Sequence, residues 1–156
     1  MRRPILRSSW LILALAGCAA APTQQGGGGG SPLDARRTDL QAAAPPPGAA
    51  TVEEFDTTTP AEQAAARALP SVAEEQLGRT VASLGDPADP GFWALTPLVS
   101  QVRPGRLVDP RTGFSVMVEL RPRDGGGGTE VSLPALRALG VPLTALPEIV
   151  VYSSAP

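Results

Sequence analysis

The most reactive side chain in this sequence belongs to Cys18, the only cysteine, which ends the run Leu-Ala-Gly-Cys at residues 15–18. A thiol is the most readily alkylated nucleophile among the side chains present, and the small alanine and glycine before it suit the cleft of a peptidase. The run closes an apolar segment that begins at Trp10 and follows three arginines in residues 1–7. This layout is typical of a secretory signal peptide. We therefore expect residues 1–17 to be removed on export.

The same four residues resemble the lipobox of bacterial lipoproteins. The resemblance implies cleavage before Cys18 and attachment of diacylglycerol, with acyl chains such as palmitate, to its thiol. Membrane lipid is then an expected partner, because each buried methylene contributes about 0.8 kcal/mol and two or three chains hold durably. Ala19, the residue after the cysteine, implies by the same resemblance release to the outer membrane rather than retention at the cell membrane. The mature chain is thus expected to face the periplasm.

Two other interpretations of this N-terminus compete with acylation. A transmembrane anchor is too short, because the 12 residues from Trp10 to Ala21 form a helix of about 18 Å against roughly 30 Å of hydrocarbon. An ordinary signal peptide cut after Ala21, with Cys18 incidental, stays open. A lone free cysteine fits poorly in a disulfide-forming compartment, which favours the acylated form.

Composition limits the chemistry that the mature chain can perform. The sequence has no histidine, and all 13 of its basic residues are arginine. It therefore lacks an imidazole base, a histidine-ligated metal, a Schiff-base lysine and a phosphate-loop lysine, so we expect no cofactor and no metal. Three arginines leave with the signal, so 10 remain against 15 carboxylates, a balance near −5 that argues against a nucleic-acid partner. An enzyme built from carboxylates is not excluded, but a non-catalytic protein is favoured.

Glycine and proline patterning divides the mature chain into a tether and a folded part. Residues 18–58 are rich in Gly, Pro and Ala, with five glycines at 26–30 and three prolines at 45–47, and are predicted to be a disordered spacer. Residues 59–78 are predicted to form a short helical connector. Its first helix starts with Thr59 as cap and Pro60 at the first position, and Ser71-Val72-Ala73-Glu74 predicts a second helix that stops at Gly78.

Residues 79–156 carry the branched apolar residues and are predicted to be a small β domain. Residues 105–108 and 114–120 predict a hairpin across a Pro/Gly turn, with Phe114, Val116, Val118 and Leu120 on one face. Residues 80–84, 92–95 and 148–152 predict further strands, and residues 132–140 predict a two-turn helix. The expected fold class is mainly β, a small β-barrel or sandwich with one short helix.

The order of elements in this domain resembles the double-psi β-barrel of rare lipoprotein A-type proteins. The likeness rests on residues 111–118, on Glu130-Val131-Ser132 and on a helix that ends Ala138-Leu139-Gly140. It implies a barrel of that kind and, in its catalytic members, a peptidoglycan lytic activity. The family's catalytic aspartate would fall near Pro122, so an enzyme here would need a displaced acid, either Glu119, Asp124 or Glu130.

A second resemblance covers most of residues 53–152. Residues 77–93 are similar to a small alphaproteobacterial lipoprotein family whose members often carry a D-galactarate dehydratase label. Such sugar-acid dehydratases use metal-assisted proton abstraction, for which this chain has neither histidine nor lysine. The label is therefore taken as an inherited name.

Three side chains are candidates for ligand binding, and no residue is assigned as catalytic. Trp93, beside Phe92 after a Pro-Gly turn, is able to stack on a sugar ring, although such a pair is more often part of a core. Glu119 and Glu130 are able to flank a cleft, although solvated carboxylates are commoner. Their expected partner is peptidoglycan or another envelope protein. Arg121, Arg123 and Arg137 offer charge for an acidic ligand such as a peptide stem, or else form a solvated face.

Overall fold

In the computed structural model, residues 40–154 are described. The expected signal peptide at 1–17, the acylation site at Cys18 and the glycine run at 26–30 lie outside the described residues. Among residues 40–154, no helix has the length and apolar character needed to span a membrane.

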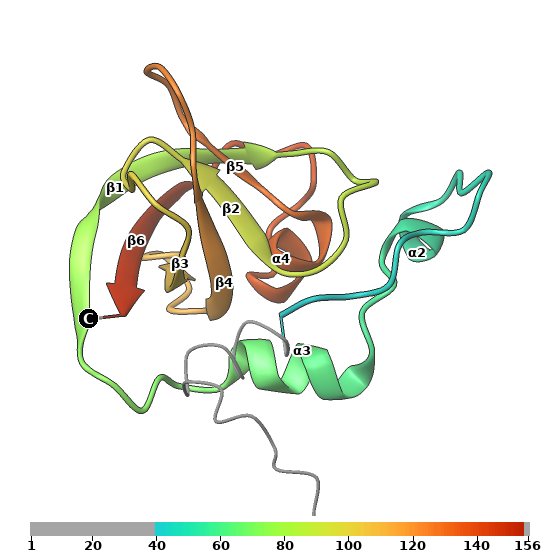
Figure 1. Cartoon of the computed structure of the whole chain (residues 1–156), viewed down its shortest axis with the longest axis horizontal. Coiled ribbons are helices and arrows are strands. Elements are labelled where there is room, and N and C mark those ends of the chain that lie inside the picture. The colour runs from blue at the N-terminus through green and yellow to red at the C-terminus, as the bar shows by residue number, and fades with distance from the viewer. Residues whose placement is uncertain (1–39, 155–156) are drawn as a thin grey trace, which may run out of the picture.

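Six strands close into one barrel, which confirms the prediction of a mainly β fold with few short helices (Figure 1). Around the barrel the strands follow the order β1-β5-β2-β4-β3-β6. The pairs β1·β5 and β2·β4 are parallel, and the other four neighbouring pairs are antiparallel. The strands span β1 (Glu74–Leu84), β2 (Trp93–Thr96), β3 (Arg103–Val108), β4 (Ser115–Pro122), β5 (Thr129–Val131) and β6 (Glu148–Ser154).

The barrel interior is filled by side chains that alternate along the strands. Val116, Val118 and Leu120 of β4 are fully buried, as the alternation predicted, and they meet Leu107 of β3 in the core. Phe114 departs from the prediction, because it precedes β4 and is 56% exposed. The period-2 pattern does not apply to Phe114, since that residue belongs to the turn.

The predicted hairpin forms between β3 and β4, with Leu107 paired to Val116. In its turn, Gly113 adopts a φ of 75°, and its N–H donates to the carbonyl oxygen of Asp109. The Asp109 carboxylate accepts from the backbone N–H and the guanidinium of Arg111. The Arg111 side-chain hydrogen bond is the largest cause that lowers the pKa of Asp109, against the opposing effect of burial. The turn is thus held by an ionised aspartate that is 1% exposed.

Gly105 allows β3 to pass close to β4 and β6. It pairs with Val118 on one side and with Ser153 on the other. A Cβ at this position would lie 2.5 Å from the carbonyl oxygen of Tyr152 and would overlap the side chain of Leu120. Only glycine fits here without a shift of the backbone.

The predicted helix after Thr59 is confirmed as α3 (Pro60–Arg67), which lies beside one end of the barrel (Figure 1). The Thr59 and Glu62 side chains form a reciprocal capping box, and proline occupies the first turn. Met117, on the outer side of β4, is 6% exposed and shares an apolar pocket with Ala65 and Ala68. The outer face of the hairpin is therefore buried at this point by α3.

The second predicted helix, at residues 71–78, is wrong. Residues 74–78 form the first half of β1, where Glu74 pairs with Ser154 and Gln76 with Tyr152 of β6. The Glu74 carboxylate accepts from Nε and Nη2 of Arg106 at 2.9 and 2.6 Å, and the Arg106 guanidinium lies 4.7 Å from the Tyr152 ring centroid. Long-range strand pairing and this ion pair override the local capping-box pattern.

The folded part also starts earlier than the predicted boundary at residue 58. Leu40 is 6% exposed and belongs to the core, and its carbonyl oxygen accepts from the N–H of Phe92 at 2.7 Å. A short helix, α2 (Val52–Phe55), follows with its own capping box at Thr51. Residues 40–58 are therefore associated with the barrel, although their composition predicted a tether.

The predicted helix at 132–140 is present as α4 (Leu133–Ala138). Ser132 precedes it in extended geometry, but its hydroxyl accepts from the backbone N–H of Trp93 at 3.1 Å instead of capping the helix. Gly140 follows the helix with a φ of 68°, the conformation that a helix stop of this kind requires. Leu136 of the helix and Leu139, the residue that caps its end, are completely buried.

Candidate functional site

The barrel brings the three predicted ligand-binding residues onto three adjacent strands, β4, β2 and β5. Trp93 pairs with Glu119, and Leu95 pairs with both Arg121 and Glu130. Residues two apart share a face of a strand, and Ala94 between Trp93 and Leu95 is fully buried. The sequence candidates thus lie along the outer side of the barrel wall.

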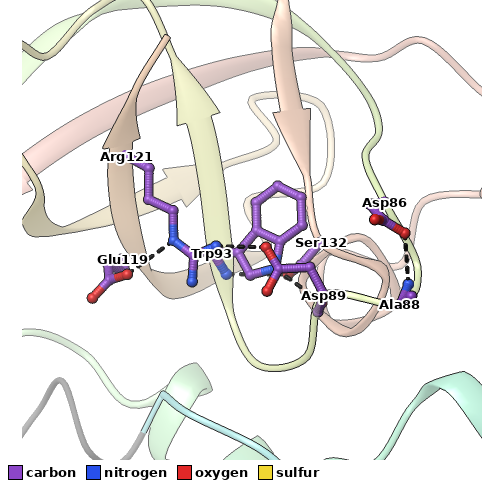
Figure 2. Close-up of polar contacts among 7 residues, drawn as sticks. All are labelled: Asp86, Ala88, Asp89, Trp93, Glu119, Arg121 and Ser132. Carbon is purple, nitrogen blue, oxygen red and sulfur yellow. Dashed lines mark hydrogen bonds and ion pairs between the residues drawn. The ribbon is translucent and has the colours of Figure 1, made fainter. Parts of the chain in front are cut away.

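Trp93 lies on the outer side of this wall but is covered by its neighbours, so it offers no open ring face. Its side chain is 3% exposed, and its Nε1 donates to the carbonyl oxygen of Asp89 at 3.0 Å (Figure 2). A Cβ added at Gly85 would come within 2.5 Å of the indole Cη2, so the strand end is packed directly on the ring. This burial favours the core interpretation of Trp93 over a sugar-stacking role.

Arg121 covers the remaining side of the indole and connects two carboxylates. Its guanidinium carbon lies 5.2 Å from the Trp93 ring centroid. Nη1 binds the Asp89 Oδ2 at 2.6 Å, and Nε binds the Glu119 Oε1 at 2.9 Å (Figure 2). The Glu119 side chain is 16% exposed. Asp89 belongs to an Asp-Pro-Gly run, which is typical of a turn, so no local pattern in the sequence indicated this network.

Glu130 is held in a separate ion pair with Arg123. The Arg123 Nη2 lies 3.2 Å from the Glu130 Oε1, and its Nη1 donates to the carbonyl oxygen of Gly128 at 3.1 Å. This arginine therefore connects β5 to the preceding loop, which contains four glycines at residues 125–128. Asp124 lies exposed at the start of the same loop.

The geometry of this wall suits structural ion pairing better than acid catalysis. A general acid has to present a proton to the leaving group, within hydrogen-bond reach. Glu119 and Glu130 are each bound by an arginine, so neither carboxylate is presented alone to a substrate. Within residues 40–154, no group of three or more His, Cys, Asp or Glu side chains could hold a metal ion.

Comparisons with family models, with curated proteins and with solved structures gave no match to this chain.

Proposed function

We propose that this chain is a lipid-anchored protein of the bacterial cell envelope whose β-barrel binds or scaffolds without catalysing a reaction. The observation that carries the proposal is the run Leu-Ala-Gly-Cys at 15–18, which ends in the sole cysteine after a basic and apolar N-terminus. Acylation at Cys18 accounts for both the signal-like segment and the single thiol. Peptidoglycan or another envelope protein is the partner within reach of a barrel held at the periplasmic side of a membrane.

The non-catalytic part of the proposal is supported by the residues of the barrel wall. The chain has no histidine and no lysine, so acid–base chemistry would fall to carboxylates. Two of the three candidate acids, Glu119 and Glu130, are engaged by Arg121 and Arg123. These ion pairs favour a structural role for the two carboxylates over a role as general acids.

A lytic enzyme with a displaced acid is the second candidate, and one residue favours it. Asp124 is exposed on the loop that follows β4, two positions beyond Pro122, where the resembled family places its aspartate. The closed six-strand barrel is compatible with the double-psi architecture that this resemblance implies. The galactarate dehydratase label gains no supporting residue from residues 40–154, which contain no cluster suited to a metal.

Acylation is tested by growing cells with labelled palmitate and isolating the full chain. We expect label and membrane sedimentation for the wild type, loss of both in Cys18→Ser, and no change in the control Ser9→Ala. Mass spectrometry of the N-terminal peptide gives the site directly. An unmodified N-terminus on soluble material would refute the anchoring proposal, and density-gradient separation of the two membranes locates the wild-type chain.

The binding role is tested by incubating the purified chain with peptidoglycan sacculi. We expect the chain to sediment with sacculi, or with an envelope protein that crosslinks to it, and to release no anhydro-muropeptides. Release by the wild type that disappears in Asp124→Asn but persists in Asp86→Asn would instead establish the lytic alternative. Trp93→Phe keeps an aromatic core residue, so we expect unchanged sedimentation of that variant.

A further inference from the structure

A second surface feature lies away from the wall of β4, β2 and β5. It is a pocket of about 490 Å³ between the ends of α3 and α4 and the β3–β4 turn. Its lining combines two arginines, Arg67 and Arg137, with the aromatic residue Phe114 and with Ser115. Charged and apolar residues thus line one hollow, which is the composition expected of a small-molecule site.

The two arginines of this pocket are less engaged than those on the wall. Arg121 and Arg123 are bound to carboxylates, whereas Arg67 forms no ion pair or hydrogen bond through its side chain to any of residues 40–154. Arg137 uses Nη1 for Asp56 at 3.1 Å and keeps 42% of its side chain exposed. A guanidinium has five N–H donors, so both arginines have donors available to a ligand.

Asp56 does not cancel the positive charge at the pocket. Its side chain is 7% exposed, and its Oδ1 accepts from the hydroxyl of Thr58. It lines a smaller adjoining pocket of about 220 Å³, which shares Arg67 and Arg137 with the larger one. Two guanidiniums against one carboxylate leave a formal charge of +1. Both arginines lie in the last turns of their helices, where part of this charge offsets the helix dipoles.

Phe114 is held in an exposed position by its surroundings. Its carbonyl oxygen accepts from the N–H of Asp109 at 3.0 Å, and its own N–H donates to the Thr112 hydroxyl at 3.2 Å. A Cβ at Gly140 would lie 3.2 Å from the ring, so this glycine leaves space for the ring against the end of α4. Phe114 is 56% exposed and lines the pocket with the arginines. An apolar ring fixed next to free cationic donors is suited to a ligand that is part apolar and part anionic.

We propose that this pocket binds an organic carboxylate whose neighbouring group is apolar. Arginine binds carboxylates through two parallel N–H bonds, and the aromatic ring covers the adjoining carbon atoms. A formal charge of +1 matches a monoanion better than a phosphate dianion. The carboxylate belongs either to the C-terminus of a peptide or to a free small acid. This inference rests on the proposed binding role and is independent of acylation at Cys18.

The test uses the purified full chain, labelled with 15N in detergent micelles, and two matched probes. N-acetylphenylalanine carries the carboxylate, and N-acetylphenylalaninamide replaces it with a neutral amide. We expect saturable amide shifts at Gly113, Ser115 and Ala138, with the acid binding at least about tenfold more tightly, a difference of about 1.4 kcal/mol. Equal affinity for acid and amide, or no shift at these residues, would overturn the proposal.

Variants separate a specific site from general attraction to charge. Arg67→Gln is expected to weaken binding of the acid about tenfold, while Arg79→Gln, an exposed arginine outside the pocket, leaves it unchanged. Equal loss in both variants would overturn the proposal, and unchanged amide spectra elsewhere confirm that Arg67→Gln folds. N-acetyl-trialanine tests the source, because tighter binding than the single amino acid supports a peptide and weaker binding supports a small acid. A chain that is acylated or binds sacculi but shows no carboxylate preference refutes this inference alone.

Discussion

The contact of Arg121 with Trp93, Asp89 and Glu119 gives the sharpest test of how the barrel wall is stabilised. Replacing Arg121 by alanine removes two ion pairs, at 2.6 and 2.9 Å, and the guanidinium that covers the indole. The Arg121 side chain is 33% exposed and Glu119 is 16% exposed, so the interaction with Glu119 is partly shielded from water. We expect this single change to reduce stability more than loss of an ordinary surface arginine.

The expected magnitude follows from the exposure of each partner. The pair with Asp89, which is 40% exposed, contributes about 0.5 kcal/mol. The less exposed pair with Glu119 contributes about 1–1.5 kcal/mol, and the cation–π contact contributes about 0.5–1 kcal/mol. Their sum lowers the free energy of unfolding by about 2–3 kcal/mol. Arg79→Ala is the matched control, because Arg79 and Glu148 are 58% and 56% exposed and contribute less than about 0.5 kcal/mol.

Urea unfolding of the chain without residues 1–17, with the fluorescence of Trp93 as probe, measures the loss of free energy of unfolding in Arg121→Ala and in Arg79→Ala. A double-mutant cycle with Glu119→Gln isolates the shielded pair, for which we expect a coupling of about 1 kcal/mol. If Arg121→Ala and Arg79→Ala lower the free energy of unfolding by amounts that agree within about 0.5 kcal/mol, the network around Arg121 contributes no more than an exposed ion pair. The wall would then be stabilised by apolar packing alone.

Three further changes test the barrel. The free energy of unfolding falls as the pH drops below about 4, because the pKa of Asp109 is lowered in the folded state. Asp109→Asn flattens this pH dependence, measured by urea unfolding at a series of pH values. Equal pH dependence in the wild type and the variant would contradict the role of the ion pair. Gly105→Ala lowers the free energy of unfolding by about 1–3 kcal/mol or more, which is measured as a lower melting temperature. Gly126→Ala, where an added Cβ meets open space, leaves the melting temperature unchanged within error. Arg106→Ala lowers the free energy of unfolding by about 2–4 kcal/mol, because it leaves the Glu74 carboxylate without its ion-pair partner. Removing both side chains, in Arg106→Ala with Glu74→Ala, lowers it by less than the sum of the two single changes. Strictly additive losses would refute the coupling.

Local patterns in the sequence predicted several elements correctly. The capping box of Thr59 and Glu62, the turn at Gly113 and the helix stop at Gly140 each depend on residues within about four positions of one another. Backbone dihedral preferences and short-range hydrogen bonds determine such features. The alternation in β4 also indicated the core face, except at Phe114, where the turn interrupts the period.

Predictions failed where distant segments compete with local preference. Glu74 ends a plausible capping box that starts at Ser71, but pairing with β6 and the ion pair with Arg106, 32 residues away, place it in a strand. Leu40 lies in a stretch whose composition predicted a tether, and its burial depends on the contact with Phe92. These outcomes depend on apolar burial and register across the barrel, which no window of sequence contains.

The sequence by itself determined which reactive side chains this protein has, namely a single thiol behind a basic and apolar N-terminal segment, with arginine as the only basic residue. It also indicated a mainly β fold, because the branched residues and turn signals are local. Only the tertiary structure decided which charges are engaged. Barrel closure brings Arg121 to Asp89, and it brings Arg67 and Arg137 together beside Phe114. Such contacts join residues far apart in the chain, and strand register and helix packing alone set their distances.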